Sequence, residues 1–205
     1  MQIDRIRAPS IVVRKENFVD LPKISKCLPE FKPVSSELSQ VLSEAKMHVL
    51  SYHLPGTSRL SQWSLLYTAR RDGYSHITFF EKLENVNETI VAIKDIRGYV
   101  FGAFVTEEWH NTRSFYGNGY SFVFTFRDGD DLEIYPATGE SDFFVQSDER
   151  GFIIGGSDNI SQRPALSVSD SFARGHSSKS DCYSNERLSS PPLGTSNEEG
   201  DFTID

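Results

Sequence analysis

The fold is decided by residues 90–105, which read IVAIKDIRGYVFGAFV. Two apolar runs, residues 90–94 and 99–105, flank the short stretch Asp95-Ile96-Arg97-Gly98. Apolar runs rich in β-branched and aromatic residues, separated by a few turn residues that include glycine, are typical of a β-hairpin. This stretch therefore predicts two antiparallel strands joined by a tight turn.

Further strand-like runs lie on both sides of this hairpin. Before it, Trp63–Ala69 reads as a strand that ends at Arg71-Asp72-Gly73. After it come Ser121–Phe126, Leu132–Tyr135, Phe143–Gln146, Phe152–Gly156 and Ala165–Val168. In Ser121–Phe126 large aromatics alternate with smaller residues, which predicts one buried face. Repeated short strands with Gly, Asp and Asn turns favour antiparallel sheets stacked as a sandwich.

Two segments have helical character. Apolar residues recur at helical spacing from Leu38 to Val49, with Ser35 or Ser36 as the N-cap and Leu54-Pro55-Gly56 as the stop. The residues of Ser75–Leu83 suit a short helix and a strand equally well. The fold class is therefore α+β and mainly β: a two-sheet antiparallel β-sandwich flanked by short helices.

The two ends of the chain and one internal segment lack a sustained period. Residues 1–34 contain four prolines and read as an extended or flexible leader, so the domain is expected over residues 35–205. Residues 169–200 are polar and Ser-rich, which predicts a surface loop. Phe202–Asp205 resumes a strand pattern and then stops. We expect a C-terminal truncation here, with an open sheet edge through which the chain self-associates.

Composition and charge disfavour several classes of protein. The net charge is −8, and residues 127–205 carry sixteen Asp and Glu against six Lys and Arg. This disfavours nucleic-acid binding, which needs a concentrated basic face, and favours a basic protein partner. No run approaches the ~20 apolar residues of a membrane span. Cys27 and Cys182 are too few for a disulfide framework, so we expect a cytoplasmic protein with at most peripheral membrane association.

Several short blocks occur in the order typical of one known family. They are His53-Leu54-Pro55, Trp63–Tyr67, Asp72–Ser75, Val91–Asp95, Gly98–Phe104, Glu107–Trp109, Phe115–Gly119, Ser121–Phe124, Ile154–Gly156, Gly175–Ser177 and Asn185–Leu188. Each block alone is a weak signal. The ordered series, over about residues 36–205, resembles the TLDc domain, the module shared by the oxidation-resistance proteins and the TBC–TLDc proteins.

The resemblance implies a β-sandwich with a helix at Ser75–Leu83. It also implies a non-enzymatic interaction protein that protects against oxidative stress and binds peripheral subunits of the vacuolar proton-pumping ATPase, with recruitment to endolysosomal or vacuolar membranes. Two positions depart from the family pattern. Tyr120 stands where the family commonly has Glu, and Ser180 stands where it usually has cysteine, with Cys182 two residues later. The second departure weakens any redox role for that cysteine.

The residues themselves leave an enzymatic alternative open, a hydrolase or a peroxide-handling enzyme. Glu107 and Glu108 follow a buried strand, and carboxylates of this kind serve as general acid or base. Consecutive strand residues point to opposite faces, however, so the two are poorly placed to meet one substrate. His176 beside Ser177 and Ser178 is the best local pairing of base and nucleophile, but no nucleophile-elbow pattern accompanies it.

No cofactor, metal or catalytic residue is predicted. Asp128–Asp131 lacks the distal Glu of a calcium loop and reads as a hairpin turn. Gly155-Gly156 is not followed by the Lys-Ser/Thr of a phosphate-binding loop. The remaining candidates are for partner binding, in two loops: Glu107, Glu108, Trp109, His110, Tyr116, Gly117, Asn118, Gly119 and Tyr120. Exposed tyrosines suit interface anchors, and the paired glycines allow a sharp turn.

Overall fold

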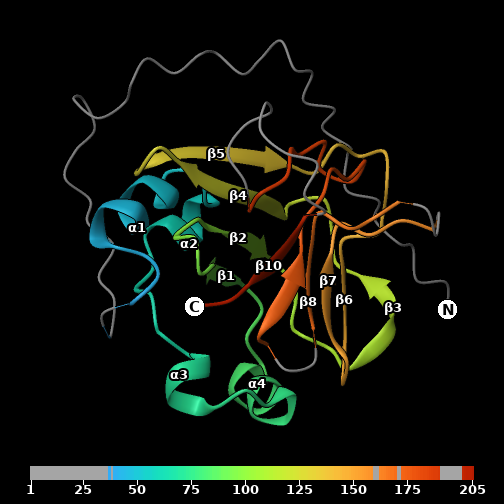
Figure 1. Cartoon of the computed structure of the whole chain (residues 1–205), viewed down its shortest axis with the longest axis horizontal. Helices are drawn as coiled ribbons and strands as arrows, with labels where there is room; N and C mark the ends of the chain where they lie inside the picture. Colours follow the sequence, from blue (N-terminus) through green and yellow to red (C-terminus); the bar gives the residue numbers. More distant parts are fainter. Residues whose placement is uncertain (1–36, 38, 159–161, 170–171, 190–199) are drawn as a thin grey trace, which may run out of the picture. The chain divides into compact units, whose positions relative to one another are not determined.

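The computed structural model describes residues 37, 39–158, 162–169, 172–189 and 200–205 (Figure 1). All of these residues belong to one of the two units into which the chain divides, Lys32–Asp205. The leader predicted for residues 1–34 lies outside the described residues. So do both predicted N-caps, Ser35 and Ser36.

The predicted hairpin forms two neighbouring strands of the first sheet, one at the edge and one inside the sheet. Its strands are β1 (Thr89–Lys94), β2 (Val100–Val105), β4 (Phe122–Arg127) and β5 (Asp131–Pro136), in the order β1-β2-β4-β5. β1 and β2 are antiparallel, with Thr89 opposite Val105, which confirms the hairpin. The Asp95 carboxylate caps the turn, accepting hydrogen bonds from the backbone N–H groups of Arg97 (3.0 Å) and Tyr99 (2.9 Å).

The second sheet is made mostly of short strands from the C-terminal half. It contains β3 (Thr112–Tyr116), β6 (Val145–Asp148), β7 (Gly151–Ile154), β8 (Leu166–Ser169), β9 (Arg174–His176) and β10 (Asp201–Thr203), in the order β10-β9-β8-β7-β6-β3. Every neighbouring pair is antiparallel. These strands confirm the runs predicted around Phe143–Gln146, Phe152–Gly156 and Ala165–Val168.

The main core lies between the two sheets. Phe101 and Val123 of the first sheet share one apolar cluster with Val145, Ile154 and Leu166 of the second. Each of these side chains is almost completely buried. The alternation of side chains along a strand sends every second residue into this layer. The predicted two-sheet antiparallel β-sandwich is therefore confirmed.

A second apolar cluster covers the other face of the first sheet. Helix α1 (Glu44–Ser51) buries Met47 and Leu50 there, in the cluster that also contains Phe124 and Phe126 of β4. All six residues of β4 are consequently buried. The prediction of a single buried face for this strand was wrong, because α1 shields the face that would otherwise meet water.

The remaining helices are short. They are α2 (Gly56–Arg59), α3 (Ala69–Asp72) and α4 (His76–Leu83), and Figure 1 shows α3 and α4 together, away from α1 and α2. α4 confirms the helix implied at Ser75–Leu83, and its N-cap Ser75 accepts from the Thr78 N–H at 3.4 Å. The predicted first helix starts later than expected, because Ser43 caps it at Glu44 by accepting from the Lys46 N–H.

The strand predicted at Trp63–Ala69 is not formed. Trp63 makes one isolated bridge, residues 64–68 carry no assigned strand, and α3 begins at Ala69. The Tyr67 ring packs edge-on against Phe79 of α4, with ring centroids 5.4 Å apart. The half-buried Tyr67 thus packs on a helix and not on a neighbouring strand.

The prediction of a polar surface loop over residues 169–200 was wrong for residues 172–189. This segment contains β9, and its buried residues include Cys182, Tyr183, Asn185 and Leu188. Serine hydroxyls make the burial feasible: Ser177 accepts from the Leu188 N–H at 2.9 Å, and Ser180 donates to the Gly155 carbonyl at 2.7 Å. Buried polar groups paired in this way carry little desolvation penalty.

Strand β10 is bonded to both sheets. On one side it pairs with β9, with Phe202 opposite Gly175. On the other side the Thr203 carbonyl accepts from the Ile96 N–H at 3.0 Å, and the Asp205 N–H donates to the Lys94 carbonyl at 2.9 Å. We call this second set of contacts the seam.

Self-association of the chain stays a prediction. Within the described residues, no helix is long and apolar enough to cross a membrane.

Candidate functional site

The predicted partner-binding residues lie in two loops that the structure brings together. The first loop connects β2 to β3 and contains Glu107–His110, and the second connects β3 to β4 and contains Gly117–Tyr120. Tyr116 is the last residue of β3. We call residues 106–110 and 116–120 the loop surface.

Asn118 joins the two halves of the loop surface. Its side-chain amide donates to Glu107 Oε1 at 2.6 Å, and its Oδ1 accepts from the Thr106 hydroxyl at 2.8 Å. The same oxygen accepts from the Tyr120 N–H at 3.0 Å. One side chain therefore fixes both the end of β2 and the turn that follows β3.

Tyr116 fastens the first loop to the second sheet. Its hydroxyl lies 2.6 Å from Ser147 Oγ and accepts from the His110 N–H at 3.1 Å. The His110 ring packs edge-on against the Tyr116 ring, with centroids 5.1 Å apart. Burial raises the pKa of Tyr116, so it stays a neutral phenol at physiological pH. Tyr116 is thus part of the support of the surface.

Trp109 also supports the loop surface from within. It is only 5% exposed, and its indole N–H donates to Thr89 Oγ1 at 2.8 Å. The ring contacts Phe79 and Phe152 at centroid distances of 5.2 and 5.3 Å. A buried residue of this kind cannot contact a partner directly, so its candidate role changes from contact to positioning.

The exposed part of the surface is the glycine turn and its tyrosine. Gly117 has φ of +106°, a conformation that side chains with a Cβ rarely adopt, and Gly119 is exposed. Tyr120 follows with 69% of its surface exposed. A large amphipathic ring held outward on a turn with fixed backbone is well suited to bind another protein.

The structure does not bring Glu107 and Glu108 to one point. Glu107 accepts from Asn118, whereas Glu108 Oε1 accepts from the backbone N–H of Asn85, at 2.8 Å, in the segment after α4. Both are half-buried. Each carboxylate has a structural hydrogen bond of its own, and the arrangement does not form a paired acid and base.

The histidine–serine pairing at His176 is not formed either. His176 Nδ1 lies 2.7 Å from Asp201 Oδ1, while Ser177 accepts from Leu188 and Ser178 donates to the Pro164 carbonyl at 2.9 Å. The neighbouring hydroxyls are therefore committed to the backbone. Asp201, on β10, is a partner that the local sequence does not indicate.

The predicted hairpin turn at Asp128–Asp131 is confirmed. It joins β4 to β5, and Lys46 of α1 forms an ion pair with Asp130 there. Asp128 and Gly129 both have positive φ, as tight hairpin turns require. Among the described residues, no group of three or more His, Cys, Asp or Glu is arranged to hold a metal ion.

Cys182 is placed in the core and is 0% exposed. Burial raises the pKa of its thiol to about 12, so almost none of it is thiolate at neutral pH. The hydroxyl of the neighbouring Tyr183 forms a hydrogen bond with Ser121 Oγ, 2.8 Å away, directly below the loop surface. Sequence reasoning missed this support because residues 177–189 show no strand or helix period.

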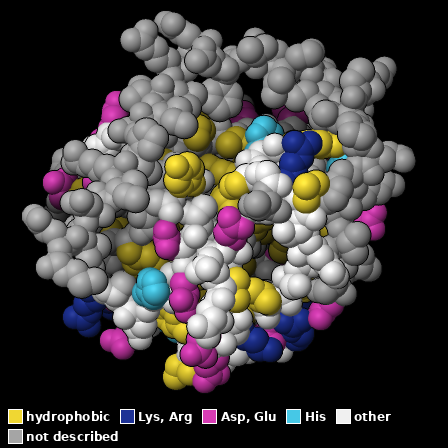
Figure 2. Space-filling view, turned by 180° about the vertical axis from the view of Figure 1, so that it is seen from behind, with side chains coloured by type: hydrophobic (Ala, Val, Ile, Leu, Met, Phe, Trp, Pro, Cys, Tyr) yellow, Lys and Arg dark blue, Asp and Glu magenta, His cyan; other side chains and the backbone are white. Residues whose placement is uncertain are grey.

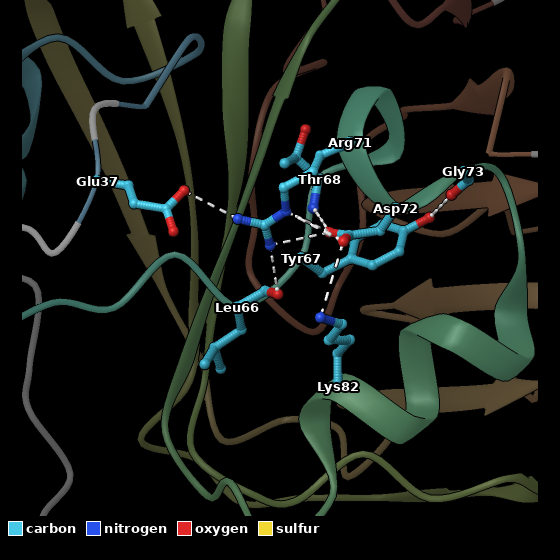
Figure 3. Close-up of polar contacts among 8 residues, drawn as sticks. All are labelled: Glu37, Leu66, Tyr67, Thr68, Arg71, Asp72, Gly73 and Lys82. Atoms are coloured by element: carbon cyan, nitrogen blue, oxygen red, sulfur yellow. Dashed lines mark hydrogen bonds and ion pairs between the residues drawn. The ribbon is translucent and has the colours of Figure 1, made fainter.

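A polar cluster around Arg71 and Asp72 fixes the segment before α4 (Figure 3). Arg71 donates to Glu37 Oε2 and to the Leu66 carbonyl, both at 2.9 Å. Asp72 accepts from the Thr68 N–H at 2.9 Å, and hydrogen bonding from Arg71 lowers the pKa of its carboxyl. All of these groups are satisfied by the chain itself, so we assign the cluster a structural role.

Comparison with known proteins gives the family. The family model for the TLDc domain matches residues 35–205. The chain belongs to the TLDc family. The matched range also contains both loops of the loop surface, so the candidate site is part of the TLDc domain itself.

The alignments with curated relatives cover only part of each relative's length. The chain is 33% identical to oxidation resistance protein 1 of Bos taurus over 127 residues, which is 62% of this chain and 14% of that protein. It is 31% identical to oxidation resistance protein 1 of Yarrowia lipolytica over 105 residues, 47% of this chain and 45% of that protein. It is 25% identical to nuclear receptor coactivator 7 of Gallus gallus over 158 residues, 77% and 17% respectively.

Proposed function

We propose that this TLDc protein is a binding module that acts in resistance to oxidative damage by contacting peripheral subunits of the vacuolar proton-pumping ATPase. The family match and the relatives named for oxidation resistance support the oxidative-stress part of this proposal. The pump as partner and a cytoplasmic place of action at endolysosomal or vacuolar membranes follow from the family resemblance. The loop surface is the proposed contact.

One observation carries the choice of surface: Asn118 binds both loops together while Tyr120 is held outward. A contact region that is already ordered loses little conformational entropy when it binds. Aromatic anchors near the centre of an interface provide most of the binding energy. The partly buried carboxylates of Glu107 and Glu108 add acidic groups beside this anchor, in agreement with a basic partner surface.

The test is a quantitative pull-down of purified pump subunits on immobilised protein. We expect Tyr120→Ala to weaken capture at least about tenfold, the range of an interface hot spot. Tyr74→Ala is the matched control, because Tyr74 is 58% exposed and lies outside the loop surface. Equal capture by the two variants would remove the loop surface from the proposal, and no capture by the unmodified chain would remove the pump.

The enzymatic alternative has a direct test of its own. Pure protein is assayed for peroxide consumption and ester hydrolysis beside the Glu107→Gln and Glu108→Gln variants. Glutamine keeps the oxygen that accepts from Asn118 or Asn85 but removes the titratable proton. Turnover that is lost in either variant would replace the binding proposal with a catalytic one.

A further inference from the structure

The outer face of the second sheet forms a groove of about 830 Å³. Because Phe152, Ile154 and Val168 point into the core, the residues between them along β7 and β8 point to the opposite face. β9 and β10 continue the groove, which ends at the β1–β2 turn. None of its lining residues belongs to the loop surface.

One row of this groove runs across the strands and carries small side chains. Gly151 is opposite Ser169, and Arg174 is opposite Thr203. Extending the β8–β9 register from the pair Val168–Gly175 places Ser169 beside Arg174. Small side chains on both sides of Arg174 leave its guanidinium accessible along the groove.

The cations of the groove differ in how they are engaged. At one end Arg150 forms an ion pair with Asp148 at 2.8 Å, and at the other Arg97 lies 3.6 Å from Asp95 Oδ2. The Asp201 carboxylate is occupied by His176. Arg174, between them, is exposed, and no hydrogen bond or ion pair engages its guanidinium among the residues that the structure describes.

The groove is therefore basic in its middle on a chain of net charge −8. Acidic side chains are spread over the face seen in Figure 2 and do not gather in one patch. The carboxylates in the groove already have cationic or imidazole partners, so within the described part of the chain the uncompensated group there is a guanidinium. A planar guanidinium with five donors is suited to bind a carboxylate in bidentate fashion.

We propose that this groove docks an acidic segment of a partner protein, with Arg174 binding one of its carboxylates. The segment lies across β7–β10, where the hydroxyls of Ser167 and Thr203 are available to backbone groups and Ile153 offers a small apolar contact. Nucleic acid fits less well, since it needs many phosphate contacts at once and is repelled by the acidic remainder of the chain. The proposal adds a second surface to the one proposed for the pump.

The test uses a fluorescein-labelled peptide of alternating Glu and Gly, followed by fluorescence anisotropy at low salt. We expect saturable binding that weakens as ionic strength rises. Arg174→Gln should weaken it about tenfold, the effect of losing one charge-assisted hydrogen-bonded pair. Arg70→Gln makes the same change of charge at an exposed arginine outside the groove and is expected to bind as the unmodified chain does.

Several outcomes would overturn this inference. They are no binding of the Glu peptide, equal weakening by Arg174→Gln and Arg70→Gln, and equal binding of peptides with Gln or Lys in place of Glu. Tighter binding of a single-stranded oligonucleotide or a phosphatidylserine vesicle through Arg174 would replace the peptide with that ligand. Circular dichroism of each variant checks that it is folded. Tyr120→Ala, in the loop surface, should leave peptide binding unchanged, so failure of one proposal is separate from failure of the other.

Discussion

At the scale of single residues, the loop surface depends on one asparagine. Asn118 provides an amide donor for Glu107 and a carbonyl acceptor for both Thr106 and Tyr120. Ionised aspartate has the same length but only acceptors, so it cannot replace the amide donor. The pairing of the two loops is therefore a property of this residue more than of the loop lengths.

We expect Asn118→Ala to lower the free energy of unfolding by about 1–3 kcal/mol, because partly buried partners are left without their hydrogen bonds. Urea denaturation measures this loss. Tyr120→Ala serves as the control, since its exposed ring leaves stability within about 0.5 kcal/mol. A stable Asn118→Ala protein with unchanged midpoint would show that the loops are held together by other contacts.

Cys182 provides a second prediction at this scale. In a Cys27→Ser background, we expect the native protein to react with Ellman's reagent at least ~100-fold more slowly than the urea-unfolded chain, because the thiol is buried and its pKa is raised to about 12. Absorbance at neutral to mildly alkaline pH follows the reaction. Rapid labelling of the native protein would mean that Cys182 is accessible and suited to redox chemistry.

At the scale of elements, the central hairpin requires a glycine that packing, and not turn geometry, explains. A Cβ on Gly102 would lie 1.8 Å from the Val91 carbonyl oxygen of β1. We expect Gly102→Ala to destabilise the protein by at least about 1–3 kcal/mol, as strand β1 is forced away. Gly56→Ala, where nothing lies within 4 Å, is expected to be neutral or slightly stabilising. Thermal unfolding of the two variants measures this difference in stability.

The β6–β7 turn makes stability depend on pH. Hydrogen bonds from Arg150 lower the pKa of the Asp148 carboxyl below its unfolded value. A lowered pKa stabilises the fold above about pH 4 and the stabilisation is lost as pH falls through the folded value. We therefore expect Asp148→Asn to unfold more easily at pH 7 and to lose less stability on acidification. Glu149→Gln, at a carboxylate 73% exposed, should keep the acid dependence of the unmodified chain.

Elements whose apolar pattern and turn residues are close together in the sequence were predictable. Elements whose surroundings are formed by distant segments were not. Residues 90–105 contain both apolar runs and the turn between them, so the local sequence was enough to predict the hairpin. Tyr67, within Trp63–Ala69, packs against Phe79 of α4, a partner that local sequence does not reveal. The serines of residues 177–180 suggested a surface because their backbone partners come from distant positions, such as Gly155.

The same distinction holds for the candidate site. Sequence placed Glu107–His110 and Tyr116–Tyr120 in loops next to strands, and the structure has them there except for Tyr116, which ends β3. It did not show that Trp109 and Tyr116 are supports while Tyr120 is exposed, because hydrogen bonds to Thr89 and Ser147 decide this. The groove was missed because its residues alternate singly with core residues along five short strands, so no continuous motif marks it.

At the scale of the whole molecule, the sandwich is held by packing between its sheets and by the seam at β10. Phe202 of β10 packs edge-on against Phe101 of β2, with centroids 4.9 Å apart, and the seam adds hydrogen bonds beside this contact. The two sheets are therefore coupled along one side by backbone as well as by side chains. Separation of the sheets requires both sets of contacts to break.

The seam also has a consequence for the time course of folding. Lys94 and Asp205, which it joins, are 111 positions apart in the chain, whereas most strand pairs connect close neighbours. Closing so long a loop costs more entropy than forming a hairpin, so local hairpins are expected to form first and the seam last. Interactions that form after the transition state affect the rate of unfolding and leave the rate of folding nearly unchanged. The contacts of β10 thus set how long the native state persists once it has formed.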